Sequence, residues 1–120
     1  MRDHTKLEAY QVADDLTVAV YDAVKKFPAD ERFGLSLQLR RAAVSAAANI
    51  VEGSARATPA DYARFLSIAY ASACEVQYEI DLACRLGYLT AGAAESLKKK
   101  AASATRLLNR LSGAVKSFKR

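Results

Sequence analysis

The sequence predicts an all-α fold, an antiparallel up-down-up-down four-helix bundle in which residues 1–120 form a single domain. A chain of 120 residues has the size of one domain and can bury a core. Its 25 alanines, with only 5 glycines and 2 prolines, favour long helices over short strands joined by turns. Apolar residues recur at helical spacing in four segments, so we expect helices over about 5–27, 31–55, 59–86 and 91–118.

A proline separates the first two predicted helices. Steps of three and four residues define the apolar face of the first, which consists of Tyr10, Ala13, Leu16, Val20, Val24 and Phe27. Pro28 ends this helix. Asp30 is expected to cap the second helix, and Glu31 lies in its first turn, where a negative charge complements the helix dipole. The apolar face of the second helix consists of Leu35, Leu39, Ala42, Ala46, Ile50 and Gly53.

The last two helices have clear start signals. Thr58 can cap the third helix, Pro59 suits its first position, and Gly87 suits the turn that ends it. Thr90 can cap the fourth helix. Its apolar residues alternate in four- and three-residue steps, as in coiled-coil packing, and they are Leu97, Ala101, Ala104, Leu108, Leu111, Val115 and Phe118. Short connections between the helices favour antiparallel neighbours.

The net charge of +5 is unevenly distributed. Residues 95–120 hold eight lysines or arginines and one acid, whereas the rest of the chain holds ten basic and twelve acidic residues. A basic segment of this kind suits an anionic partner, either nucleic acid or membrane headgroups, and it also promotes solubility. Both explanations are open at the level of composition.

No segment of the sequence predicts membrane insertion. The uncharged stretches 42–51 and 65–74 are far shorter than the roughly 18 apolar residues that span a bilayer. The first residues show neither a secretory nor a lipidation signal, and we therefore expect a cytoplasmic protein with no membrane contact. Cys74 and Cys84 are ten positions apart on one predicted helix, roughly 15 Å, so we expect free thiols.

The side chains that enzymes use most often are scarce. His4 is the single histidine, so a catalytic triad, a histidine acid–base pair and a histidine-rich metal site all lack material. Glu75 and Glu79 have no histidine on any predicted helix to complete a carboxylate-bridged metal site. We expect no enzyme activity, no cofactor and no metal.

Polar residues form a stripe beside the apolar face of the second helix. At 100° per residue, this stripe contains Gln38, Arg41, Ser45, Asn49 and Glu52. If the second and third helices are antiparallel, Ser72 faces Arg41 and Ser45, and Glu75 faces Gln38 and Arg41. We call these seven residues the polar seam and expect an Arg41–Glu75 ion pair within it. The seam is either a half-buried network that sets helix register or a surface that faces another subunit or a ligand.

Two further features bear on partners. Alanine buries little area per residue, so an alanine-rich bundle gains burial by forming a homo-oligomer. Basic side chains are predicted on outward helix faces, and the candidate nucleic-acid contacts are Arg40, Lys98, Lys99, Arg106, Arg110 and Lys116. The alternative is that this basic surface is merely solvated, since no aromatic residues interleave it for stacking on bases.

The stretch QLRRAAVSAAANIVEG at 38–53 resembles the signature of the four-helix-bundle proteins encoded in intervening sequences of bacterial large-subunit ribosomal RNA genes. The similarity continues through FLSIAYASACE at 65–75 and LGYL at 86–89. The chain departs from the family pattern at Ala46-Ala47, where Ile-Pro is usual, and at Ala71, where glycine often precedes the serine.

The resemblance implies homo-oligomeric rings, typically pentamers, and a relation to the accessory proteins of diversity-generating retroelements. Those proteins resemble basic barrels that bind nucleic acid and a reverse transcriptase. The matching positions overlap the polar seam and carry no catalytic role; they are Gln38, Arg40, Arg41, Ser45, Asn49, Glu52, Gly53, Ser72 and Glu75. We therefore expect a non-enzymatic homo-oligomeric bundle that binds RNA or a nucleic-acid-handling partner. The alternative is a protein–protein scaffold with no nucleic-acid role.

Overall fold

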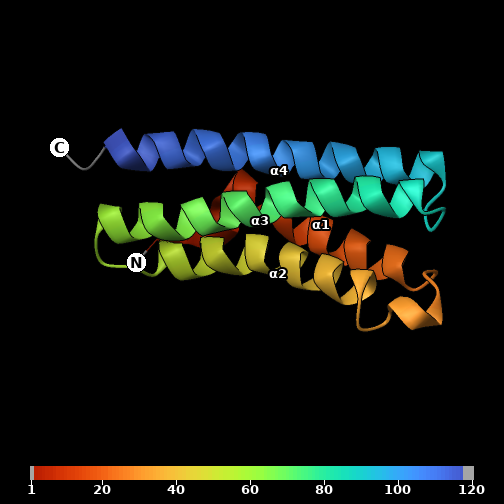
Figure 1. Cartoon of the computed structure of the whole chain (residues 1–120). Coiled ribbons are helices and arrows are strands. Elements are labelled where there is room, and N and C mark those ends of the chain that lie inside the picture. Colours follow the sequence, from red (N-terminus) through yellow and green to blue (C-terminus); the bar gives the residue numbers. More distant parts are fainter. Residues whose placement is uncertain (1, 118–120) are drawn as a thin grey trace.

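The structure is a computed structural model that describes residues 2–117, and this part of the chain forms helices and no strands (Figure 1). The elements are η1 (His4–Lys6), α1 (Glu8–Val24), η2 (Ala29–Glu31), α2 (Leu35–Ser54), α3 (Pro59–Arg85) and α4 (Ala91–Ser117), where η marks a 3₁₀ helix. The all-α fold class is confirmed.

The four α-helices lie alongside one another, and chain neighbours run in opposite directions (Figure 1). α1 packs on α2 and α4, and α3 packs on α2 and α4, which closes the bundle. The up-down-up-down arrangement is confirmed, and the molecule is elongated, with dimensions of 48 × 23 × 19 Å. Phe118, the last residue of the predicted apolar face of the fourth helix, lies outside the described residues.

The helix boundaries at α3 and α4 follow the local sequence signals. The Thr58 side chain accepts a hydrogen bond from the Asp61 backbone N–H at 3.1 Å, and Pro59 is the first residue of α3. Gly87, directly after α3, has a φ of 80°, a conformation that glycine adopts without steric cost. Thr90 caps α4 by accepting from the Ala93 N–H at 3.1 Å.

The start of α2 differs from the prediction. Asp30 is not an N-cap, because Ala29–Glu31 form a separate 3₁₀ helix and α2 begins only at Leu35. The Glu31 carboxylate does the capping, since it accepts from the Leu35 N–H at 3.0 Å. A Cβ atom on Gly34 would lie 2.6 Å from that carboxylate, so glycine makes room for the cap.

The first helix is also shorter than expected. It was predicted over 5–27, whereas α1 spans Glu8–Val24 and a 3₁₀ turn, η1, precedes it. Asp3 supplies the reason, because its side chain accepts from the Thr5 N–H at 3.0 Å and caps the 3₁₀ turn instead of an α-helix.

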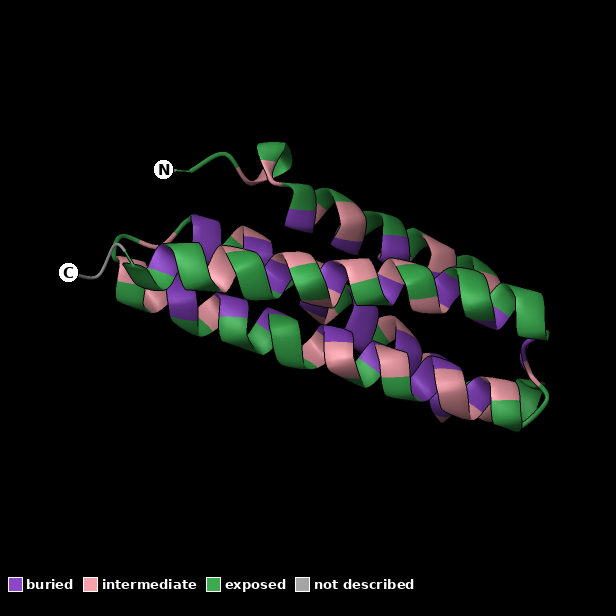
Figure 2. Ribbon diagram, turned by 90° about the horizontal axis from the view of Figure 1, so that it is seen from above, coloured by how far each residue is buried: buried purple, intermediate pink, exposed green. Residues whose placement is uncertain are grey.

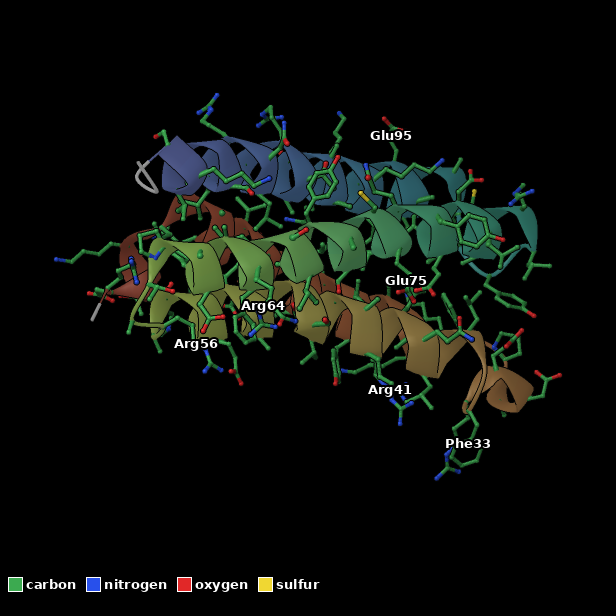
Figure 3. The ribbon with its side chains drawn as sticks, turned by 60° about the vertical axis from the view of Figure 1, so that its left-hand side comes forward. Phe33, Arg41, Arg56, Arg64, Glu75 and Glu95 are labelled. Atoms are coloured by element: carbon green, nitrogen blue, oxygen red, sulfur yellow. The ribbon has the colours of Figure 1, made fainter. Side chains whose placement is uncertain are left out.

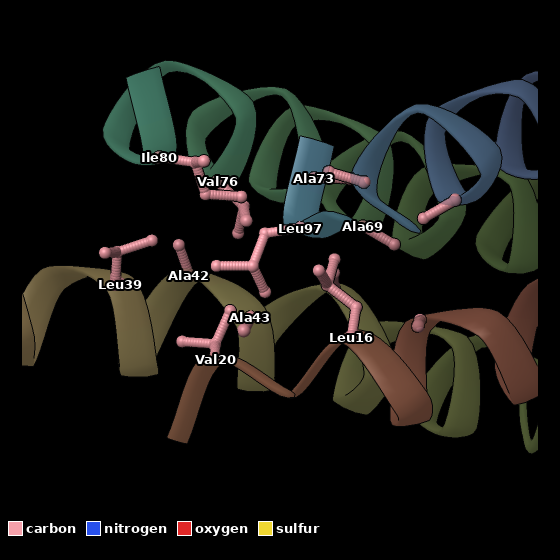
Figure 4. Close-up of a cluster of buried hydrophobic side chains, with 14 of the residues drawn as sticks. Leu16, Val20, Leu39, Ala42, Ala43, Ala69, Ala73, Val76, Ile80 and Leu97 are labelled. Atoms are coloured by element: carbon pink, nitrogen blue, oxygen red, sulfur yellow. The ribbon is translucent and has the colours of Figure 1, made fainter. Parts of the chain in front are cut away.

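The core is narrow because much of it is alanine. Figure 2 shows buried residues along the inward faces of the helices and exposed residues on their outer faces. In Figure 4, Leu16 and Val20 of α1 meet Leu39 of α2, Val76 of α3 and Leu97 of α4. Fully buried alanines lie between these larger side chains on all four helices; they include Ala13, Ala43, Ala46, Ala69, Ala73, Ala101 and Ala104.

α2 and α3 approach each other closely at Gly53. A Cβ atom there would lie 3.0 Å from Phe65 Cβ, 3.0 Å from Tyr62 Cδ1 and 3.3 Å from the Tyr62 carbonyl oxygen. Contacts this short to backbone and to a Cβ atom cannot be relieved by rotating a flexible side chain. Glycine at this position therefore sets the distance between the two helices at their connected ends.

We predict that Gly53→Ala lowers the free energy of unfolding by about 1–3 kcal/mol, because the added methyl group overpacks the α2–α3 contact. Urea unfolding followed by circular dichroism measures this change. Gly113→Ala is the matched control, since a Cβ atom on Gly113 in α4 meets nothing within 4 Å. The control should raise the free energy of unfolding by up to about 1 kcal/mol, as alanine does in an open helix position. Equal effects of the two substitutions would contradict the prediction.

Candidate functional site

The centre of the polar seam connects α2 to α3. The Ser45 and Ser72 hydroxyl oxygens are 2.8 Å apart across the two helices. The Asn49 side-chain amide donates to the Ser45 carbonyl at 2.9 Å and lies 3.0 Å from the Ser45 hydroxyl. All three residues are half-buried. Hydrogen bonds at the edge of an apolar contact favour one axial alignment of the helices over others.

The outer members of the seam do not join this network. Gln38, Arg41, Glu52 and Glu75 are exposed, and Glu52 binds Arg56 one turn further along α2 at 3.0 Å. The expected Arg41–Glu75 ion pair is not formed: of the ion pairs within residues 2–117, none involves either side chain.

Side-chain direction explains why the pair is missing. Arg41 is two positions after the buried Leu39, which places it about 200° around the helix, on the outer surface of α2. In Figure 3, Arg41 extends away from α3, whereas Glu75 points toward α2. The two residues are therefore at similar heights along the bundle and still face different directions.

Glu79 is the residue that the sequence analysis left out of the seam. Its side chain is only 3% exposed, and its Oε1 atom is buried with no hydrogen-bond partner. Burial, a side-chain hydrogen bond with Glu75 and the charge of Glu75 together raise the pKa of Glu79 from 4.5 to about 8. Glu79 therefore carries a proton at neutral pH. Its seven-residue spacing from Ser72 was the available signal, since it aligns the two on one face of α3.

The basic residues predicted to contact nucleic acid are divided among different environments. Lys99, Arg106, Arg110 and Lys116 are exposed on α4. Lys98 is half-buried and binds Asp81 of α3 at 3.2 Å. Arg40 lies on α2, half-buried, with its guanidinium carbon 6.0 Å from the centre of the Tyr21 ring.

Three of the exposed α4 residues line up along the helix. Lys99, Arg106 and Arg110 are separated by seven and four positions, which are the steps that keep side chains on one helix face. At 1.5 Å per residue, the steps are about 10 Å and 6 Å along the axis. We call these residues the α4 stripe. No ion pair within residues 2–117 involves any of the three.

A second group of arginines lies at the α2–α3 turn, and the sequence analysis did not single it out. The guanidinium carbons of Arg56 and Arg64 are each 4.5 Å from the centre of the Phe65 ring. Both arginines are also bound to carboxylates, Arg56 to Glu52 at 3.0 Å and Arg64 to Asp61 at 3.1 Å. Figure 3 shows the two side chains near each other. Because each charge has a partner within the chain, this group is a weaker anion site than the α4 stripe.

A shallow groove of about 290 Å³ runs between α1 and α2. It is lined by Tyr21, Leu37, Arg40, Arg41, Val44 and Ser45. Tyr21 is 46% exposed and Val44 is 41% exposed, and Val18, on α1, is 65% exposed. Apolar residues exposed side by side mark a surface that can bind a protein partner.

Two kinds of site are not found in the described part of the chain. Within residues 2–117, no three histidine, cysteine or carboxylate side chains gather in a way that could hold a metal ion. No helix there is long and apolar enough to cross a membrane. Cys74 and Cys84 are free and half-buried.

The comparisons with known proteins agree with this architecture. The sequence profile of the 23S rRNA-intervening sequence protein family matches residues 5–110. The chain belongs to this family. Its helices also match the crystal structure of a protein of unknown function from the S23 ribosomal protein family of Bacteroides thetaiotaomicron VPI-5482. That match has a TM-score of 0.81 and 25% sequence identity, and it covers 88% of this chain and 95% of the other. No curated protein matches the chain.

The family match includes the whole polar seam and the α4 stripe, and it ends before Lys116. Neither the family description nor the structural neighbour indicates an enzymatic activity. The relation to retroelement accessory proteins stays a prediction.

We predict that stability falls as pH rises from about 4.5 to about 8, because of Glu79. In this range the unfolded chain has released the Glu79 proton and the folded chain still holds it, so raising the pH favours unfolding. Glu79→Gln should remove most of this slope, since glutamine keeps the shape without titrating. The midpoint of urea unfolding, measured at several pH values, tests this. Glu95→Gln is the control, an exposed carboxyl on α4 that should leave the slope unchanged. A parallel pH dependence in the wild type and Glu79→Gln would contradict the prediction.

Proposed function

We propose that this protein is a non-enzymatic, cytoplasmic, homo-oligomeric helical bundle that binds RNA through the α4 stripe. The observation that supports this proposal is the alignment of Lys99, Arg106 and Arg110 on the outer face of α4, where none of them pairs with a carboxylate of residues 2–117. Unpaired cationic side chains at regular intervals bind phosphates independently of base sequence.

Two ion pairs between α4 and its neighbouring helices support the same assignment. Lys98 binds Asp81 of α3, and Lys100 binds Asp15 of α1 at 2.9 Å. These two lysines link α4 to α3 and α1. Because each is already paired with a carboxylate, it binds an external anion weakly. The side chains of the α4 stripe form no ion pair within residues 2–117, so their charges are available to an anionic partner. Of the basic residues at 95–117, Lys99, Arg106, Arg110 and Lys116 are exposed and form no ion pair within residues 2–117.

The homo-oligomeric part of the proposal is supported by the α1–α2 groove. Exposed Val18, Tyr21 and Val44 lose contact with water when a second copy covers them. The alanine-rich core leaves such a bundle with limited burial of its own, so assembly adds stability. The family resemblance implies a ring, typically a pentamer.

The same groove supports a second candidate function. Its exposed apolar residues and two arginines suit a protein partner, so a protein–protein scaffold with no nucleic-acid role is the alternative. In that case the α4 stripe serves solubility only.

We predict that the variant Lys99→Ala/Arg106→Ala/Arg110→Ala binds structured RNA about tenfold more weakly than the wild type at low salt. Each lost phosphate contact should also reduce the slope of log affinity against log salt by roughly 0.7–0.9. Filter binding at two or more salt concentrations measures both quantities. The control variant Lys6→Ala/Lys25→Ala/Arg32→Ala removes the same charge from exposed positions on the first half of the chain. If wild-type protein shows no binding at low salt, or both variants lose affinity equally, the α4 stripe is not an RNA site.

We predict that light scattering gives a mass that is a multiple of the 13.0 kDa chain at micromolar concentration. Val44→Asp should shift the mass toward that of the single chain, because a charge would be buried in the assembled groove. Asn109→Asp places the same charge on an exposed position of α4 and serves as the control. A wild-type protein that stays monomeric at every concentration would rule out both the homo-oligomer and a self-assembled scaffold.

A further inference from the structure

Arg41 and Glu75 are opposite charges that lie at the same height on neighbouring helices without meeting. The Ser45–Ser72 hydrogen bond sets the register of α2 against α3. Arg41 is four positions before Ser45 and Glu75 is three positions after Ser72, so in antiparallel helices the two backbones are nearly level. Both side chains are exposed, and neither has an ion-pair partner within residues 2–117.

Glu75 lies one turn before a buried carboxyl group of α3. That group is Glu79, whose pKa is raised to about 8 by burial and by the neighbouring Glu75. In Figure 3 the Glu75 side chain points toward α2. An exposed carboxylate that pairs with no cation within residues 2–117 is well suited to accept one from outside.

Arg41 lies at a groove that has both apolar and polar lining residues. It lines the α1–α2 groove together with Tyr21, Leu37 and Val44. Arginine is more weakly hydrated than lysine and forms planar, two-pronged contacts with carboxylates, so it is the cation best suited to an interface. The groove lies between α2 and α1, and Glu75 lies on α3, the other neighbour of α2.

We propose that in the assembled protein Arg41 of one copy binds Glu75 of a second copy, while the exposed Val44 on α2 of each copy contributes apolar surface to the contact. This inference rests on the homo-oligomer of the proposed function and names the pair that holds it. Each copy carries both the donor and the acceptor, so the contact can be satisfied in a two-fold dimer or around a closed ring. A bidentate Arg–carboxylate contact that loses its water on assembly would also select the orientation of the copies.

A charge-exchange experiment tests the pair. Arg41→Glu and Glu75→Arg each place like charges at the contact, so each variant should have the mass of the single chain at a concentration where the wild type is assembled. The double variant Arg41→Glu/Glu75→Arg restores opposite charges and should regain most of the wild-type mass. Light scattering gives the masses, and thermal melting shows whether each chain is folded. Glu75→Gln, which changes shape least, should weaken assembly without reversing the charge.

The same mass and melting measurements are made on two control variants. Arg32→Glu and Glu95→Arg make equal charge changes at exposed positions outside the surface and should keep the wild-type mass. Folded single variants that keep the assembled mass would overturn the Arg41–Glu75 pair and leave the homo-oligomer intact. A folded double variant that stays monomeric would also overturn the pair. A monomeric wild type would overturn the homo-oligomer and this inference together, whereas RNA binding by the α4 stripe would be unaffected.

Discussion

The close contact of α2 with α3 is the constraint on which the rest of the structure depends. It is possible because glycine and alanine occupy the facing positions: Gly53 lies against Tyr62 and Phe65, and Ala46 and Ala69 are fully buried. At this separation the Ser45 and Ser72 hydroxyls are within 2.8 Å. Small residues set the distance, and the hydrogen bond selects the register. The remaining helices then pack against this pair through Leu16, Val20 and Leu97.

A narrow core has consequences at the surface. The alanines that allow close helix packing bury little area per residue. Polar and apolar side chains at the edges of the helix contacts are therefore left exposed or half-buried. Glu79 of α3 is the extreme case, since it is buried, forms no ion pair within residues 2–117 and has a pKa raised to about 8. Val44, Tyr21 and Arg41 are the opposite case, an apolar and cationic surface that a second molecule can cover.

The packing of the helices places some charged side chains in ion pairs and leaves others without a partner within residues 2–117. On α4, lysines that face α1 and α3 bind Asp15 and Asp81, whereas Lys99, Arg106 and Arg110 face outward alone. At the α2–α3 turn, Arg56 and Arg64 are neutralised by Glu52 and Asp61 and rest on Phe65. A count of basic residues cannot make this distinction, because it depends on which acid each side chain reaches. The α4 stripe is therefore a row of outward-facing charges that pair with no acid within residues 2–117.

The sequence by itself determined the helices, most of their ends and the faces that form the core. These features depend on local chemistry: the spacing of apolar residues, the caps at Thr58 and Thr90, and the glycine at position 87. The contact of Ser45 with Ser72 was also predictable, since it follows from antiparallel register. The tertiary structure alone decided which charges meet. Glu31 caps α2 and binds the Tyr88 hydroxyl, 57 positions away, where the sequence had pointed to Asp30. Arg41 turns away from Glu75, and Glu79 becomes buried. Ion pairing depends on the direction of each side chain and on the solvent around it, and both are set only when the helices pack.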